Sequence, residues 1–220
     1  MPTDKMLSRK DGPIGSMIFN NPERHNATSL EMWEAADEIL QDFANDKSIR
    51  VVVISGAGGK AFVSGADISK FESERATEAA VKHYNKTSDR MSTTLASMQK
   101  PTIAMIQGWC IGGGVSVATT CDLRVCSEDS KFGVPAAKLG LGYGIKGIRR
   151  LADLVGPSMR NSASTPHSGS RRLSAPSRAA RARVWNPSIQ VCDVAMMSIT
   201  ADRLLCSILR TADIARAMNS

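Results

Sequence analysis

Short runs of apolar, mostly branched residues alternate along this chain with longer segments in which apolar residues recur every three or four positions. Three of the short runs are sharply bounded and predict strands: 14–19, 50–55 and 102–106. The first of them pairs with the residues before the turn Asp11-Gly12-Pro13, which predicts a hairpin over residues 6–21. The longer segments predict helices with one apolar face, so the pattern is that of an α/β protein.

Two helices stand out in this pattern. The first begins near residue 30, where Asn26, Thr28 or Ser29 can cap it and Glu31 lies in its first turn. The second is predicted as one long helix from Glu74 to Met98, with these side chains inward: Ala80, Val81, Tyr84, Met91, Leu95 and Met98. A further helix is expected over residues 145–155, ending at Gly156-Pro157.

A glycine-rich loop follows the predicted strand at 50–55. Its glycines at 56, 58, 59 and 65 permit unusual backbone angles and a close approach of a flat or extended ligand. Asp67 can cap a helix that begins near Ile68. The loop has neither the spacing of a dinucleotide fingerprint nor that of a Walker loop, so it does not indicate a nucleotide-hydrolysing or dehydrogenase fold.

A second glycine-rich segment follows the predicted strand at 102–106. Gly112, Gly113 and Gly114 open a small-residue segment, 115–120, which predicts a tightly packed helix. The free N–H groups of a first helical turn favour an anion or a developing oxyanion. Tight helix packing explains three glycines equally well, so both interpretations stay open. Two strand–loop–helix units with glycine-rich loops predict a layered α/β domain that binds its ligand where the loops converge.

The composition of the chain indicates its number of domains and its cellular compartment. The chain has 220 residues, enough for one domain with a full core. Five cysteines, odd in number and without metal-ligand or C-x-x-C spacing, suit a reducing cytosol as buried thiols: Cys110, Cys121, Cys126, Cys192 and Cys206. The first ten residues do not resemble a signal peptide and no run approaches membrane-spanning length, so we expect a cytoplasmic protein without membrane partners.

The net charge of +7 comes mostly from one end of the chain. Residues 157–220 hold nine arginines against three aspartates, whereas residues 1–156 are nearly neutral. The basic end has no interleaved aromatic residues and no basic helix face. The charge therefore does not indicate a nucleic-acid partner.

Four motifs occur in order along the chain: NNPERHNATSLEMW, GKAFVSGADI, KPTIAMIQGWCIGGGVSVATTCDLRV and KFGVPAAKLGLG. They resemble the successive signatures of the crotonase (enoyl-CoA hydratase/isomerase) family over roughly residues 5–158. The resemblance implies a spiral of ββα turns and an acyl-CoA thioester as substrate. It also implies a homotrimer or a hexamer of paired trimers, and no cofactor, because coenzyme A is part of the substrate.

The resemblance assigns roles to particular residues. Two backbone N–H groups, those of Ala66 and Gly113, are expected to hold the thioester oxygen, whose charge grows as an enolate forms. Arg24 is expected near the coenzyme A phosphates, although a merely solvated side chain is the alternative. The remaining residues expected to bind substrate are Lys60, Ala61, Phe62, Ser64, Gly65, Asp67 and Gly112.

The chain departs from the hydratase pattern at two catalytic positions. The family's two glutamates are replaced by Ser116 and Ala136, and neither can act as a base or an acid at neutral pH. Ordinary hydration by the usual route is therefore unexpected. Tyr143 is a candidate replacement, because some decarboxylating members of the family resemble this chain in placing a tyrosine near the acyl group. Asp122, His25 and His83 are expected to have no catalytic role.

The second departure is at the end of the chain. Residues 159–220 lack the family's C-terminal helices and are rich in serine, arginine, proline and alanine. Helical periodicity and family resemblance are lost together, which suggests a frameshift or a mis-joined exon near residue 160. Translation of the other two reading frames tests this hypothesis, and it is wrong if neither frame yields the missing helices. The alternative is a disordered basic extension.

Three functional interpretations remain open on the sequence alone. The first is an acyl-CoA enzyme of the hydratase/isomerase class that keeps its oxyanion hole and its coenzyme A loop. The second is a non-catalytic acyl-CoA-binding homologue, because both glutamates are absent. The third is an unstable product whose missing helices leave an aggregation-prone apolar surface.

Overall fold

The computed structural model of the chain describes residues 3–135 and 144–155. Strands β1 (Met6–Asp11) and β2 (Ile14–Phe19) form the predicted antiparallel hairpin, with Gly12 at a φ of 52° in its turn. After the 3-10 turn η1 (Pro22–Arg24) comes helix α1 (Leu30–Asn45), whose apolar face is buried. The hairpin and the first amphipathic helix are therefore where the hydrophobic pattern predicts them.

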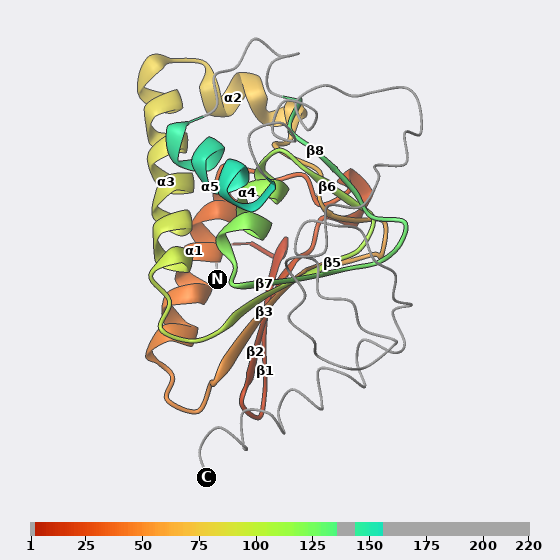
Figure 1. Cartoon of the computed structure of the whole chain (residues 1–220). Coiled ribbons are helices and arrows are strands. Elements are labelled where there is room, and N and C mark those ends of the chain that lie inside the picture. The colour runs from red at the N-terminus through yellow and green to blue at the C-terminus, as the bar shows by residue number, and fades with distance from the viewer. Residues whose placement is uncertain (1–2, 136–143, 156–220) are drawn as a thin grey trace.

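Three repeats follow, each with a first strand in a larger sheet, a second strand in a smaller sheet, and then helix (Figure 1). The first comprises β3 (Val51–Gly56), β4 (Ala61–Val63), η2 (Ile68–Lys70), α2 (Phe71–Arg75) and α3 (Glu78–Ala96). The second comprises β5 (Thr102–Ile106), β6 (Trp109–Ile111) and α4 (Gly113–Thr120). The third comprises β7 (Leu123–Cys126), β8 (Lys131–Gly133) and α5 (Ile145–Val155). These ββα repeats confirm the predicted crotonase-like α/β fold.

The two sheets have the strand orders β1-β2-β3-β5-β7 and β4-β6-β8. Apart from the β1–β2 hairpin, all pairs are parallel. Consecutive repeats therefore lie side by side in both sheets, and the loops that follow β4 and β6 leave the same edge of the smaller sheet. This arrangement brings residues 64–67 and 112–114 together although almost fifty positions separate them in the sequence.

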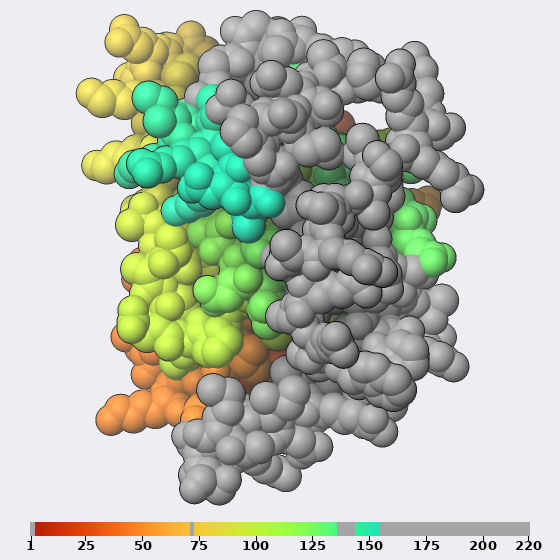
Figure 2. All heavy atoms as spheres, viewed as in Figure 1, coloured from red at the N-terminus to blue at the C-terminus, as the bar shows by residue number. Residues whose placement is uncertain are grey.

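The main core lies between the larger sheet and the helices. In β3, Val52 and Ile54 belong to this core, whereas Val53 joins a smaller apolar cluster with Ile14 and Ile103. The alternation follows from the two-residue period of a strand. Helices α1 and α3 pack along each other (Figure 1), and α5 lies on the surface beside α4 (Figure 2).

The predicted helix over Glu74–Met98 is confirmed for Glu78–Ala96, which is α3, but its expected first residues up to Arg75 belong to the separate helix α2. Helix α2 ends at Arg75, and Thr77, in an extended conformation, caps α3 by accepting a hydrogen bond from the Ala80 N–H at 3.1 Å. Val81, predicted to point inward, is 36% exposed because it lies in the first turn of α3, ahead of the first buried residue, Tyr84. The spacing of apolar residues does not reveal a side-chain cap such as Thr77, so it does not predict where α3 begins.

Part of the predicted organisation lies outside the described residues. This applies to the boundary at residue 158, to the segment 159–220 and to the stop at Gly156-Pro157. Within residues 3–135 and 144–155, no helix is both long enough and apolar enough to cross a membrane.

Candidate active site

The three glycines at the start of α4 serve different purposes. Gly112 has a φ of 53°, which L side chains rarely adopt, and its N–H donates to the Gly133 carbonyl at 2.8 Å. A β-carbon at Gly114 would lie only 2.4 Å from the Val63 carbonyl oxygen, so this glycine allows α4 to pack against β4. At Gly113 a β-carbon would meet only the Trp33 ring, at 3.4 Å, an ordinary contact. The tight-packing interpretation therefore explains Gly114 but not Gly113.

The backbone around Ala66 is held by Thr28, its partner in an isolated parallel bridge. The Thr28 N–H donates to the Gly65 carbonyl at 2.8 Å, and the Asp67 N–H donates to the Thr28 carbonyl at 2.9 Å. In a parallel bridge of this kind, the N–H of the central residue points away from its partner. The Ala66 N–H is therefore turned away from Thr28.

The loops that carry Ala66 and Gly113 touch each other. A β-carbon at Gly112 would lie 3.8 Å from the Gly65 α-carbon, and one at Gly65 would lie 3.7 Å from the Ile111 carbonyl oxygen. Across residues 3–135 and 144–155, neither the Ala66 N–H nor the Gly113 N–H has a hydrogen-bond acceptor. Two unpaired backbone donors thus lie on adjoining loops, one of them in the first turn of a helix.

Asn26 organises the glycine-rich loop, a role that the sequence did not reveal. Its buried amide nitrogen donates to the Ala57 carbonyl at 2.9 Å and to the Ala61 carbonyl at 2.7 Å, and its oxygen accepts from the Asn21 N–H. Its φ of 55° is one that asparagine tolerates better than most residues. The sequence offered Asn26 only as a possible helix cap, and the N-cap of α1 is Ser29.

The residues expected to bind substrate divide by exposure. Ala61 and Phe62 are buried, and the Phe62 ring packs edge-on against Phe19 with centroids 6.2 Å apart, so only their backbone could meet a ligand. Arg24 and Lys60 are exposed. The Arg24 carbonyl also accepts a hydrogen bond from the Ser64 hydroxyl at 3.3 Å, which links η1 to the loop after β4.

Asp67 caps the turn that follows the loop, as the sequence predicted. Its carboxylate accepts hydrogen bonds from the Ser69 N–H at 3.0 Å and from the Ser69 hydroxyl at 2.7 Å. Burial raises the pKa of Asp67, but these two bonds and the charge of Arg24 outweigh burial and leave the pKa below its ordinary value. Asp67 is therefore a charged structural group beside the Ala66 amide.

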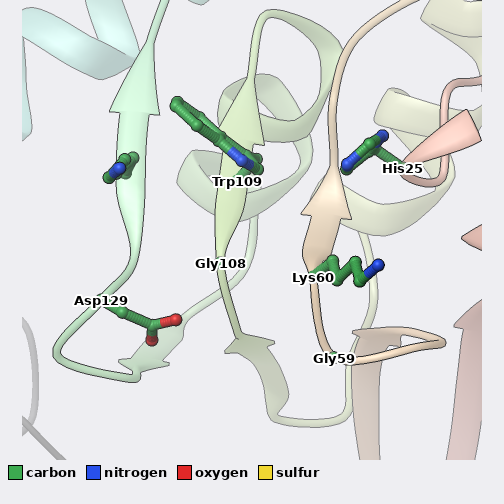
Figure 3. A pocket seen from close by; sticks show the side chains of 7 residues that line it. His25, Gly59, Lys60, Gly108, Trp109 and Asp129 are labelled. Carbon is green, nitrogen blue, oxygen red and sulfur yellow. The ribbon is translucent and has the colours of Figure 1, made fainter.

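A hollow of about 350 Å³ lies at the other end of the small sheet from Ala66 and Gly113. Its lining comes from residues at or just before the starts of the three strands and from the C-cap of η1: His25, Gly59, Lys60, Gly108, Trp109, Asp129 and Lys131. Figure 3 shows the Trp109 and Asp129 side chains among them, and the Lys131 ammonium lies 4.7 Å from the centre of the Trp109 ring. The hollow thus combines an aromatic face with several basic groups.

The chain has other residues at the positions of the family's two glutamates, and the structure describes one of these positions, Ser116. Ser116 is half-buried and lies three positions after Gly113 in α4, so the two residues share a helix face. Ala136 and Tyr143 lie outside the described residues. Asp122 is a structural partner of β5, because its carboxylate accepts hydrogen bonds from the N–H and the hydroxyl of Thr102, both at 2.8 Å.

The cysteines fit the expectation of buried thiols where the structure describes them. Cys110, Cys121 and Cys126 are buried, and burial raises the pKa of Cys121 to about 12. The other two cysteines lie outside the described residues. Within the described ranges, no three His, Cys, Asp or Glu side chains are grouped as a metal site requires.

A layered ββα protein with two unpaired amides on adjoining loops is the class that the fold and the site define. The chain matches the family model "Enoyl-CoA hydratase/isomerase" over residues 9–165, and it belongs to that family. Solved structures agree: an enoyl-CoA hydratase/carnithine racemase from Magnetospirillum magneticum is 34% identical with a TM-score of 0.69, covering 73% of this chain and 60% of that one.

Relatives in the family differ in their reactions. A short-chain-enoyl-CoA hydratase of Clostridium acetobutylicum is 31% identical over 159 residues, which is 72% of this chain and 60% of the relative. A mitochondrial Delta(3,5)-Delta(2,4)-dienoyl-CoA isomerase of Mus musculus is 35% identical over 151 residues, 63% of this chain and 45% of the relative. The chain therefore spans about half to three-fifths of the length of these relatives.

Proposed function

We propose that this chain is an acyl-CoA enzyme of the enoyl-CoA hydratase/isomerase class, in which the Ala66 and Gly113 amides bind the thioester oxygen. One observation carries the proposal: these two N–H groups lack acceptors within the described residues and lie on loops that touch at Gly65 and Gly112. The hydratase and isomerase names of its relatives support it.

The chemistry of the two amides follows from charge development. Proton removal or decarboxylation next to a thioester moves an electron pair onto the carbonyl oxygen and forms an enolate. Fixed N–H donors bind this oxygen more strongly as its charge grows, and one such donor changes the rate by about 10²–10³. Asp67 and Thr28 hold the loop backbone, so the Ala66 donor needs no reorganisation during the reaction.

The basic hollow suits the other end of the substrate. Coenzyme A carries its phosphates on the nucleotide, a pantetheine arm away from the thioester. The strands between the hollow and the amides span about 10 Å for three residues, a length that the extended arm can bridge. Lys60 and His25 offer hydrogen-bond donors to phosphate oxygens, and Arg24 lies in the turn just before His25.

A second function is favoured by the absence of a carboxylate at Ser116. With serine there and alanine at position 136, the chain lacks the base and the acid that hydration requires. An acyl-CoA-binding protein without turnover is the resulting alternative. A reaction that needs no strong base, such as decarboxylation with Tyr143 near the acyl group, is the catalytic variant that these residues suit best.

Two measurements separate these possibilities. Calorimetric titration with crotonyl-CoA should give binding that Lys60→Ala weakens about tenfold, as expected for the loss of one charged hydrogen bond. Lys82→Ala, which removes an exposed lysine from α3, is the matched control and should bind like the wild type. The absence of acyl-CoA binding to the wild type would exclude both functions.

Turnover then distinguishes the enzyme from the binding protein. Crotonyl-CoA hydration and malonyl-type acyl-CoA decarboxylation are assayed side by side, and a rate above background in either assay supports the enzyme. Tight binding without either reaction supports the binding protein. Sedimentation of the same sample tests the trimeric or hexameric assembly that the family resemblance leads us to propose.

A further inference from the structure

Trp33 of α1 lies directly behind the helix turn that presents the Gly113 amide. Its ring atoms Cζ2 and Cη2 are 3.4 and 3.6 Å from where a β-carbon on Gly113 would be, and its side chain is buried. Within the described residues, no other side chain comes within 4 Å of that point. The indole edge is therefore the side-chain surface that faces the Gly113 α-carbon within the described residues, while the next residue, Gly114, packs against Val63 of β4.

The orientation of this indole is set by hydrogen bonding as well as by packing. The Trp33 ring N–H donates to the Tyr84 hydroxyl of α3 at 2.9 Å, and both side chains are buried. Phe19 of β2 packs edge-on against the same indole, with centroids 6.1 Å apart. The Tyr84 ring is in turn covered by the Arg75 guanidinium, 4.1 Å from its centre. Two other elements, α3 and β2, thus hold the Trp33 ring.

We propose that Trp33, oriented by Tyr84, is a positioning residue that fixes the direction of the Gly113 N–H toward the thioester oxygen. The proposal rests on the function proposed above. A donor stabilises a developing charge only if it is fixed before the reaction, and a displacement of about 1 Å can cost about 10²-fold in rate. Gly112, the N-cap, and Gly113, the first residue of α4, have no side chains of their own, so side-chain contacts at the Gly113 amide come from a neighbouring element.

Tyr84→Phe is the sharpest test, because it keeps the aromatic ring and removes only the acceptor of the indole N–H. Vibrational difference spectra of bound crotonyl-CoA, labelled with ¹³C at the thioester carbonyl, report directly on donors to that oxygen. In the wild type, the carbonyl band should lie at lower frequency than in water. In Tyr84→Phe, at least half of this shift should be lost, while the dissociation constant changes less than threefold.

Thr94→Val is the matched control. It removes another hydrogen bond between α3 and α1, from the Thr94 hydroxyl to Asp37, away from Gly113. Its carbonyl shift should equal that of the wild type. Trp33→Phe is the second variant, and it should lose the shift even if Tyr84→Phe proves unstable in thermal melts.

The outcomes separate the two levels of the proposal. A full wild-type shift in both Tyr84→Phe and Trp33→Phe would overturn the positioning role and leave the proposed function intact. Equal losses in Tyr84→Phe and Thr94→Val would mean that α1–α3 packing alone matters, which also overturns it. The absence of any shift in the wild type would overturn the proposed function, and the positioning role with it.

Discussion

Replacing Gly113 by proline should remove one N–H donor to the thioester oxygen and leave the fold unchanged. Gly113 is the first residue of α4, a position where proline is tolerated because the N–H there has no partner within the helix. Within the described residues, the Gly113 N–H has no acceptor, so the substitution breaks no hydrogen bond of the folded chain. The added β-carbon would touch the Trp33 ring at about its normal contact distance.

The size of the effect follows from the chemistry of the donor. Loss of one donor to a developing oxyanion costs about 2.7–4 kcal/mol, or about 100- to 1,000-fold in kcat. The KM should change much less, because the ground-state carbonyl carries less charge than the enolate. The free energy of unfolding should stay within about 1 kcal/mol of the wild type, because no core contact is lost.

Gly113→Ala is the matched variant in this experiment. It adds the same β-carbon against Trp33 but keeps the N–H, so its kcat should stay close to that of the wild type. The assay is turnover of the acyl-CoA that the wild type converts, together with urea unfolding of all three proteins. Equal losses of kcat in the proline and alanine variants would refute the reasoning, since the β-carbon rather than the N–H would then be responsible.

Three further predictions concern stability and thiol chemistry. Asn26→Ala should lower the free energy of unfolding in urea by about 2–3 kcal/mol, because two loop carbonyls lose their donor. The hydrogen bond from Lys5 lowers the pKa of Glu31, so this group stabilises the fold above its unfolded pKa of about 4.3 and less as pH falls below it. Glu31→Gln should therefore reduce the loss of stability between about pH 5 and pH 3, and an unchanged pH profile would contradict this linkage. Burial raises the pKa of Cys121 to about 12, so this thiol is protonated at pH 8 and should react with a thiol reagent only after unfolding. The labelling is measured in a variant that lacks Cys192 and Cys206, and prompt labelling of Cys121 in the folded protein would contradict the prediction.

The local sequence pattern determined most of the elements. Runs of β-branched residues predicted β3 and β5, and the turn at Gly12 predicted the hairpin. Apolar residues at helical spacing predicted α1 and α5. Strand and helix periods are properties of neighbouring residues, so they are readable without the fold. The ordered motifs likewise pointed to the family, and the loops at Ala66 and Gly113 to the candidate site.

Only the tertiary structure decided which residue does what within those loops. Gly114 is required by the carbonyl of Val63, about fifty positions earlier, and Asn26 holds a loop more than thirty positions later. The Trp33–Tyr84 pair joins residues 51 positions apart, and in sequence both fit simply as apolar helix positions. Such partners depend on how distant segments of the chain pack against each other, and the spacing of apolar residues within one segment carries no information about that packing. The sequence thus determined the elements and the loops, whereas only the tertiary structure decided that the start of α4 packs against Val63 of β4 and faces Trp33 of α1.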